Sequence, residues 1–321
     1  MADGVFVREG GLATPLSAAA VAIGEVWQLG DGRAYVHESL TPADSNARIR
    51  MRADGVWTLQ KATGVVLLDG ARAYWDHSAN NITYTKTNDR DFYVGRVTGD
   101  AGSADNSVQV ELNVDPPYDI TLQRDAFNTT YTGTRSLTGL RLDQFGGSTR
   151  MVLGATNEAQ CVDLFSVDRF AITANPIVEF GFRVISDGAG TNTDVSIGVA
   201  NATHTSDADS ITESVFIHLD GNNTQVNAES DDGTTEVAAT DTTVDYTEGI
   251  AVANVVHCVM DLRNPSDIAI YINGAQILDA TTFTLAAATG PLGLLAHVEK
   301  SSSTDTYELA LDYMRVRYME Q

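Results

Sequence analysis

Lysine, cysteine and long apolar runs are scarce in this sequence, and each shortage excludes a class of protein. Only three of the 321 residues are lysine, and 20 basic residues stand against 43 acidic ones, a net charge of −23. A field of that sign repels nucleic acid and anionic lipid, so neither is expected as a partner. No apolar run approaches the roughly 20 residues that span a bilayer, and the longest candidate, 16–23, is mostly alanine.

The two cysteines, Cys161 and Cys258, are too few for a disulfide framework. Both lie in apolar, strand-like runs, so we expect them to be buried and reduced. The first residues, Met1 to Gly4, include no basic residue, so no secretory signal peptide is predicted.

Charge is distributed unevenly along the chain. Residues 1–115 hold 10 basic and 15 acidic residues, whereas residues 116–321 hold 10 basic and 28 acidic residues. High net charge of one sign favours solubility. The second part is therefore expected to face bulk solvent.

The sequence pattern changes at residues 113–117, and this change predicts the main domain boundary. A strand-like run, 108–112, ends there, and the consecutive prolines Pro116 and Pro117 cannot continue a strand ladder. The residues that follow are rich in Thr, Asn, Arg and Gly, without clear periodicity. We therefore expect an N-terminal arm at 1–23, a domain at 24–115, a linker at 116–138 and a second domain at 139–321.

Short strand patterns separated by turn residues recur in both domains, and no segment shows a sustained helical period. In the second domain, Asn273 and Gly274 separate two apolar runs, which predicts a hairpin because a type I′ turn needs positive φ at both central positions. All three tryptophans, Trp27, Trp57 and Trp75, fall in the first domain and are expected in its core. The prediction is an all-β protein, with a small β-barrel or sandwich followed by a larger β-sandwich or jelly roll.

Catalytic pairs are not evident. Glu308 and Asp312 share a face of a predicted strand, but roughly 13 Å separates them, against about 5 Å in a retaining glycosidase. Glu229, Asp231 and Asp232 lack the alternation and distal Glu of a calcium loop, so an acidic turn is expected. No phosphate-binding or nucleophile-elbow motif occurs. We expect no enzyme activity and no cofactor.

The six histidines show no spacing typical of a zinc site, so no metal is expected. His218 and His257 lie within strand-like runs, where neutral side chains with satisfied hydrogen bonds are expected. Two polar loops still leave a binding role open, because carboxylate and amide oxygens suit calcium and sugar hydroxyls as well as hairpin tips. The candidate ligands are Asp187, Asn192, Asp194, Asp220, Asn222 and Asn223.

Four segments between Gly24 and Asn113 form a distinctive series. They are Gly55-Val56-Trp57-Thr58-Leu59, Leu68-Asp69-Gly70-Ala71-Arg72-Ala73-Tyr74-Trp75-Asp76, Tyr93-Val94-Gly95-Arg96-Val97 and Val108-Gln109-Val110-Glu111-Leu112-Asn113. In this order they resemble the small tailed-phage proteins that decorate, or cement, the capsid. The resemblance implies a compact β-domain on the outer capsid surface that binds the major capsid protein, commonly as a homotrimer.

In that family an N-terminal arm can reach along the shell. Here Val5, Phe6 and Val7, followed by Arg8, precede the pair Gly10-Gly11 and are the candidate capsid-binding residues. Such a segment can add a strand to a partner's sheet edge, where backbone hydrogen bonds supply affinity. A frayed terminus or an edge strand of its own domain is the alternative.

Residues 139–321 carry a second series: Val256 to Leu262, the hairpin Ile270 to Gly274, and the closing strand Leu309 to Val316. It resembles the concanavalin/laminin-G-like jelly-roll group. That group includes glycan binders, spacer domains and glycosidases, so the resemblance implies the fold rather than the function.

These features predict a phage capsid decoration protein. Its first domain would clamp adjoining capsid subunits, and its acidic jelly roll would be displayed outward, with surface glycans as a further ligand class. It would be made in the host cytoplasm and located on the outer surface of the virion capsid. The alternative is a carbohydrate-binding adhesin or tail-fibre module for host recognition.

Overall fold

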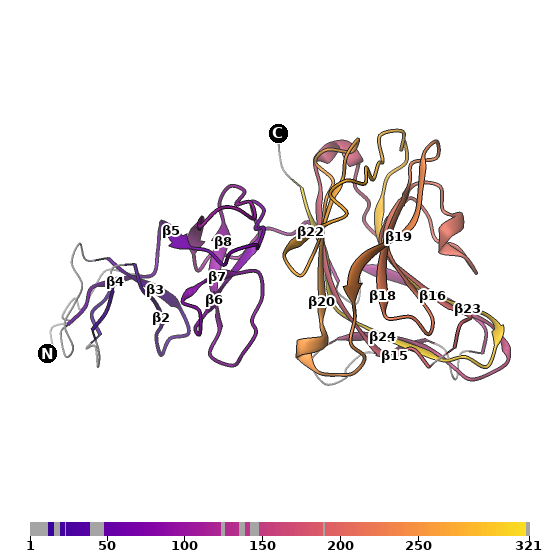
Figure 1. Cartoon of the computed structure of the whole chain (residues 1–321), viewed down its shortest axis with the longest axis horizontal. Coiled ribbons are helices and arrows are strands. Elements are labelled where there is room, and N and C mark those ends of the chain that lie inside the picture. Colours follow the sequence, from indigo (N-terminus) through magenta and orange to yellow (C-terminus); the bar gives the residue numbers. More distant parts are fainter. Residues whose placement is uncertain are drawn as a thin grey trace, which may run out of the picture. The chain divides into compact units, whose positions relative to one another are not determined.

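The computed structural model describes residues 12–15, 20–22, 24–38, 48–122, 126–134, 139–141, 148–188 and 190–318. The chain forms two compact units, Met1–Pro117 and Tyr118–Gln321, divided close to the predicted boundary after Asp115 (Figure 1). In the described ranges, helix is limited to three 3₁₀ turns: η1 (Ile172–Ala174), η2 (Ala208–Ser210) and η3 (Val252–Asn254). The predicted all-β class is confirmed. No described helix is long and apolar enough to cross a membrane.

The first unit is built from two antiparallel sheets. One has the strand order β1-β4-β3-β2, with bounds Leu12–Ala13 (β1), Val26–Gln28 (β2), Ala34–His37 (β3) and Met51–Arg52 (β4). The other has the order β5-β9-β8-β6-β7, with bounds Val56–Gln60 (β5), Arg72–Asp76 (β6), Asn81–Thr83 (β7), Phe92–Val97 (β8) and Ser107–Leu112 (β9).

The tryptophans of the first unit contribute to its core, as the sequence predicts. Trp75 is buried in a cluster that also takes Val26 from the four-stranded sheet, and Trp57 packs half-buried against the same cluster. Trp27 packs against a smaller cluster around Tyr35. The larger cluster joins the two sheets into one unit, because it draws apolar side chains from both.

Part of the expected N-terminal arm belongs to the first unit. β1 pairs with β4, and Ala13 and Val21 are buried in the small cluster with Tyr35. These positions therefore belong to the first unit and not to a separate arm, because their side chains are buried in its core. The capsid-binding candidates Val5, Phe6, Val7 and Arg8 lie outside the described residues.

The second unit is a sandwich of two antiparallel sheets. The seven-stranded sheet has the order β11-β14-β23-β16-β17-β18-β19, with bounds Phe127–Thr132 (β11), Glu158–Ser166 (β14), Thr193–Ala200 (β16), Ser214–Asp220 (β17), Gln225–Asp231 (β18), Glu236–Asp245 (β19) and Gly293–Ser303 (β23). The eight-stranded sheet has the order β12-β13-β24-β15-β20-β21-β22, with β10 beside β24 and with bounds Ile120–Thr121 (β10), Gly139–Arg141 (β12), Thr149–Leu153 (β13), Ile177–Ser186 (β15), Val256–Asp261 (β20), Ala269–Ile272 (β21), Ala275–Ile277 (β22) and Tyr307–Arg317 (β24).

A single apolar cluster fills the space between these sheets. Alternate residues of β16, such as Ile197, and of β15, such as Phe180, belong to it and are fully buried. Because side chains alternate along a strand, the remaining residues of each strand point away from this core. The predicted jelly-roll sandwich is confirmed, and both cysteines are buried and free, as expected.

The expected linker at 116–138 instead contributes strands to the second unit. β10 pairs with β24, and β11 pairs along its length with β14. Ile120 and Phe127 are buried and anchor these strands. In the sequence, these two apolar residues are separated by mostly polar ones, so the alternation of apolar and polar residues that is typical of a strand is not visible.

Candidate functional site

The outer face of the seven-stranded sheet carries a row of polar side chains. Neighbouring residues in the same strands, such as Val162 and Val298, point into the core, so the row points away from it. His297 is nevertheless 0% exposed and His218 4% exposed. Buried polar groups are costly unless they are paired, so the contacts of each one matter. Six residues lie directly opposite one another in successive strands: Thr130, Asp163, His297, Ser196, His218 and Asn227.

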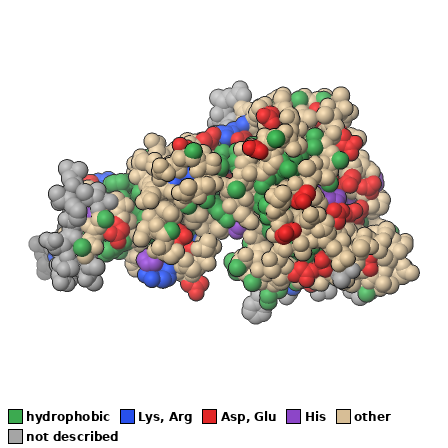
Figure 2. All heavy atoms as spheres, viewed as in Figure 1, with side chains coloured by type: hydrophobic (Ala, Val, Ile, Leu, Met, Phe, Trp, Pro, Cys, Tyr) green, Lys and Arg blue, Asp and Glu red, His purple; other side chains and the backbone are tan. Residues whose placement is uncertain are grey.

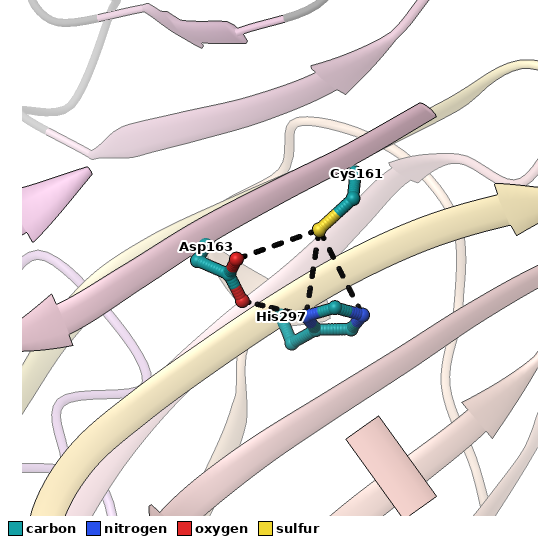
Figure 3. A group of neighbouring side chains, drawn as sticks. All are labelled: Cys161, Asp163 and His297. Atoms are coloured by element: carbon teal, nitrogen blue, oxygen red, sulfur yellow. Dashed lines mark hydrogen bonds and ion pairs between the residues drawn. The ribbon is translucent and has the colours of Figure 1, made fainter. Parts of the chain in front are cut away.

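His297, on β23, is held between two carboxylates. Its Nδ1 lies 2.7 Å from Asp163 Oδ1, and its Nε2 lies 3.0 Å from Glu299 Oε2. The Cys161 Sγ lies 3.6 Å from the same Nδ1, so thiol, carboxylate and imidazole converge from β14 and β23 (Figure 3). Burial opposes the charged form, but the contacts with Asp163, Cys161 and Glu299 hold the pKa of His297 well above its ordinary value.

This arrangement is not that of a cysteine nucleophile. A Cys–His pair needs an imidazole nitrogen free to take the thiol proton. Both nitrogens of His297 already face carboxylates, and burial raises the pKa of the Cys161 thiol. The group is therefore a buried imidazolium clamped between two strands, with a protonated thiol beside it.

His218, on β17, lies among four carboxylates. Its Nε2 is 3.2 Å from Asp220 Oδ1 and 3.3 Å from Asp194 Oδ1. On the other side, its Nδ1 is 3.4 Å from Asp209 Oδ1 of η2 and 3.4 Å from Glu229 Oε1 of β18. Three neighbouring strands, β16, β17 and β18, and the η2 turn thus bring one imidazole and four acidic groups together.

The electrostatics of this group differ from the sequence expectation. Burial opposes a charge on His218, but the contacts with Asp194, Asp209 and Glu229 raise its pKa far above the ordinary value, whereas the sequence predicts a neutral side chain. Burial raises the pKa of Glu229, whereas contact with His218 lowers that of Asp209. The acidic side chains that face solvent on the second unit are seen in Figure 2.

Two of the six loop candidates, Asp194 and Asp220, reach this group. They stand opposite each other in the β16–β17 pairing, so a cross-strand register joins what the sequence separates. Glu229 corrects a second expectation, because it lies within β18 and not in a turn. Asp231 ends β18 and Asp232 follows it, and their side chains accept backbone N–H bonds from residues 233–235 of the turn.

The other loop candidates have local structural roles. The Asp187 backbone N–H donates to Glu248 Oε1 at 2.8 Å, and Asn192 Nδ2 donates to Asp305 Oδ2 at 2.6 Å. Asn222 adopts positive φ, and Asn223 Oδ1 accepts the Gln225 N–H at 3.0 Å. These are the contacts expected of hairpin tips.

Glu308 and Asp312 on β24 are each paired with an arginine. Arg150 Nη1 lies 2.8 Å from Glu308 Oε1, and Arg183 Nη2 lies 2.6 Å from Asp312 Oδ1. Arg315, which lies on the same strand, pairs with Glu179. Two separate ion pairs offer neither the proton donor nor the nucleophile of a glycosidase.

In the first unit, two residues of the Gly24–Asn113 series have clear structural roles. A Cβ on Gly95 would lie 2.0 Å from the Glu111 carbonyl oxygen, so only glycine allows β8 and β9 to approach this closely. Asn113, at φ 57°, donates to the carbonyls of Ala34 and Ala53 and accepts the Ala34 N–H at 2.9 Å. Its side chain therefore fastens one sheet to the other.

A pocket of about 370 Å³ opens on the first unit. Its lining includes the aromatic side chains of Trp27, Trp75 and Phe92 and the charged side chains of Glu25 and Arg90. Aromatic and arginine side chains are enriched at the centres of protein interfaces. The pocket therefore has side chains of the kinds that are typical of protein interfaces.

Residues 7–112 match the family model described as phage cement protein. The first unit is similar to phage cement proteins over nearly its whole length. The match covers about a third of the chain and nearly all of the first unit, which we call the cement unit from here on. It confirms the resemblance noted in the sequence. None of the curated proteins compared with this chain matches it.

The second unit is similar to several solved jelly-roll structures. A Bacillus licheniformis β-glucanase is 13% identical with a TM-score of 0.43, and the alignment covers 64% of this chain and 96% of that one. The Emp47p carbohydrate recognition domain is 11% identical with a TM-score of 0.43, covering 61% and 90%. A Bacteroides ovatus glycoside hydrolase family 16 endo-glucanase is 7% identical with a TM-score of 0.42, covering 61% and 96%. Similarities this low do not bear on function.

Proposed function

We propose that this chain is a phage capsid decoration protein whose cement unit binds the outer surface of the capsid. The observation that carries the proposal is the family match over residues 7–112, which ends close to the division between the two units. The matched region is thus a compact unit with its own core, able to act as a separate binding module.

The partner proposed is the major capsid protein, with the cement unit assembling as a homotrimer. Decoration of this kind adds interface area across neighbouring capsomers, so the shell resists the pressure of the packaged DNA without any covalent step. Two features of the cement unit suit an interface: the aromatic pocket around Trp27 and Trp75, and the edge strand β5, where Val56 is 54% exposed.

The second unit is proposed to be displayed outward and to perform no catalysis. Its part of the sequence carries 28 acidic and 10 basic residues, which favours a surface facing solvent rather than a negatively charged nucleic acid. The carboxylates and the buried thiol described above are held in ion pairs or turns, or kept protonated, rather than arranged as acid, base or nucleophile.

The test is the location of the protein in purified particles. A decoration protein is expected in many copies per head, in proportion to the capsomers, and should co-sediment with heads that lack tails. Quantitative mass spectrometry of tailless heads and of isolated tails measures both. Recovery with tails alone would contradict the proposal and would favour the adhesin or tail-fibre alternative.

A further inference from the structure

Asp209, His218 and Glu229 surround a small space at the outer face of the seven-stranded sheet. Their ligand atoms all lie within 4.8 Å of one another. His218 Nδ1 is 3.4 Å from both Asp209 Oδ1 and Glu229 Oε1. The three side chains come from η2, β17 and β18, so the chain between residues 209 and 229 supplies the whole group.

These distances are long for hydrogen bonds and suit a shared metal ion. An N–H···O bond to a carboxylate is about 2.7–2.9 Å long, as between His297 and Asp163 at 2.7 Å. Two ligand atoms that each lie about 2.1 Å from one zinc ion, at a tetrahedral angle, are about 3.4 Å apart. The His297 imidazole is thus clamped by direct hydrogen bonds, whereas His218 Nδ1 is separated from each of its two carboxylates by about the edge length of a coordination tetrahedron.

A second observation points to a ligand in the same space. His218 Nδ1 and Glu229 Oε1 are buried, yet neither has a hydrogen-bond partner in the described ranges of the chain. His218 is 4% exposed and Glu229 is 9% exposed, so both atoms are largely shielded from bulk solvent. Buried polar atoms in folded proteins almost always have a partner, and a bound ion is one explanation for an exception.

The other side of the imidazole is arranged as in metal sites. A metal-bound histidine usually donates its second ring N–H to a carboxylate, which fixes the tautomer and orients the ring. Here Nε2 faces Asp220 Oδ1 at 3.2 Å and Asp194 Oδ1 at 3.3 Å. When a metal ion displaces the proton from Nδ1, the remaining Nε2–H faces these two carboxylates, and the Nδ1 lone pair faces Asp209 and Glu229.

The charge and donor atoms select the class of ion. Four carboxylates close to one largely buried imidazole leave excess negative charge, which a divalent cation would neutralise. Imidazole nitrogen together with carboxylate oxygen suits Zn²⁺ or Mn²⁺, whereas Ca²⁺ and Mg²⁺ prefer oxygen ligands alone.

We propose that Asp209, His218 and Glu229 bind one divalent transition-metal ion, with Asp194 and Asp220 as carboxylates that orient the imidazole. The Asp209 side chain is 53% exposed, which gives the ion a route from solvent and leaves room for water as a further ligand. The bound ion would fasten η2 to the sheet beneath it, where Ala208 and Ile211 already pack on Phe216. This role is independent of capsid binding.

The full chain, dialysed against a chelator and then freed of it, is titrated calorimetrically with ZnCl₂, MnCl₂ and, for comparison, CaCl₂. We expect one Zn²⁺ or Mn²⁺ per chain, with Ca²⁺ bound far more weakly. Asp209→Asn should weaken binding at least about tenfold, because one of the three protein ligands is impaired. Since Asp209 lies at the surface, this variant should fold even if Glu229→Gln does not.

Glu236→Gln, which removes an exposed carboxylate of β19, is the matched control and should bind as the unaltered chain does. Thermal unfolding gives a second readout, because an ion that binds only the folded state raises Tm for the unaltered chain and for Glu236→Gln but much less for Asp209→Asn. Either of two results would overturn the proposal: no stoichiometric binding by the unaltered chain, or equal binding by Asp209→Asn and Glu236→Gln.

Discussion

Lys300 shows how this acidic chain uses one of its few basic residues. The residue is 3% exposed, and its ammonium group lies within hydrogen-bond distance of the backbone carbonyls of Gly154, Thr156, Ser303 and Asp305, which share its three N–H donors. One charge thereby fastens the turn after β13 to the turn between β23 and β24. Four carbonyls around an ammonium are a strong and mutually dependent set of hydrogen bonds.

Replacing this residue should destabilise the second unit. Lys300→Met keeps the length of the side chain but leaves the buried carbonyls unpaired, so we expect the free energy of unfolding to fall by about 3 kcal/mol. Urea denaturation followed by circular dichroism measures it. Lys86→Met, at an exposed site, is the control and should change little; equal stability of the two variants would count against this role.

His257 has the opposite protonation state from His297. Burial, together with the charge of Arg315, lowers the pKa of His257 to about 4, and its Nδ1 lies 2.9 Å from the Tyr313 hydroxyl. The neutral side chain expected from the sequence agrees with this environment. Because the folded pKa is below the ordinary value of about 6.5, the unfolded chain takes up the proton first as the pH falls.

The contribution of His257 to stability should therefore be lost as the pH falls from about 6.5 toward 4. The His257→Gln variant cannot take up this proton, so its stability should depend less steeply on pH across that window. Unfolding free energies at several pH values for both proteins provide the comparison. Parallel pH profiles would show that His257 titrates alike in the folded and unfolded states.

The protonation of individual histidines could be predicted only in part. His218 and His257 look alike in the sequence, since both lie in apolar strand-like runs. What separates them is which side chains the neighbouring strands place beside each ring: carboxylates around His218, and Tyr313 and Arg315 near His257. The pairing register between strands determines which side chains lie beside each histidine, and the sequence of a single strand does not reveal that register.

At the scale of strands, Gly198 marks a close approach between β16 and β17 of the seven-stranded sheet. A Cβ at this position of β16 would lie 2.1 Å from the backbone carbonyl oxygen of Val215 in β17. Backbone atoms cannot move aside without breaking the pairing. Gly198→Ala should therefore destabilise the second unit by at least about 3 kcal/mol or prevent its folding.

Thermal unfolding of Gly198→Ala tests this expectation, and Gly30→Ala in the cement unit serves as a control. A Cβ at Gly30 would meet no atom within 4 Å, so that variant should unfold as the unaltered chain does. A Gly198→Ala protein with unchanged Tm would mean that β16 and β17 are not packed this closely.

Strands were predictable where neighbouring residues alone showed both the apolar runs and the turn between them. The hairpin at Asn273 and Gly274 is confirmed, with both residues at positive φ between β21 and β22. β10 and β11 were missed because isolated residues, Ile120 and Phe127, anchor them on long-range partners. Their pairing with β24 and β14 joins segments far apart in the chain, and no local periodicity reports such pairing.

At the scale of the whole molecule, the division into a cement unit and an acidic second unit was visible in the sequence. The consecutive prolines and the change in charge both lie near the division that the structure places between Pro117 and Tyr118. The clusters around His218 and His297 were not visible, because their members come together only when the sheet has formed. The capsid-binding arm at Val5–Arg8 stays a prediction.

The central claim is that capsid binding resides in the cement unit. Its most direct test measures the binding of two fragments, residues 1–117 and residues 118–321, to heads from which this protein has been removed. With folding of each fragment verified by circular dichroism, residues 1–117 should bind to saturation with nearly the affinity of the full chain, and residues 118–321 should not bind. A folded 1–117 fragment that fails to bind, or binding by 118–321 alone, would contradict the account.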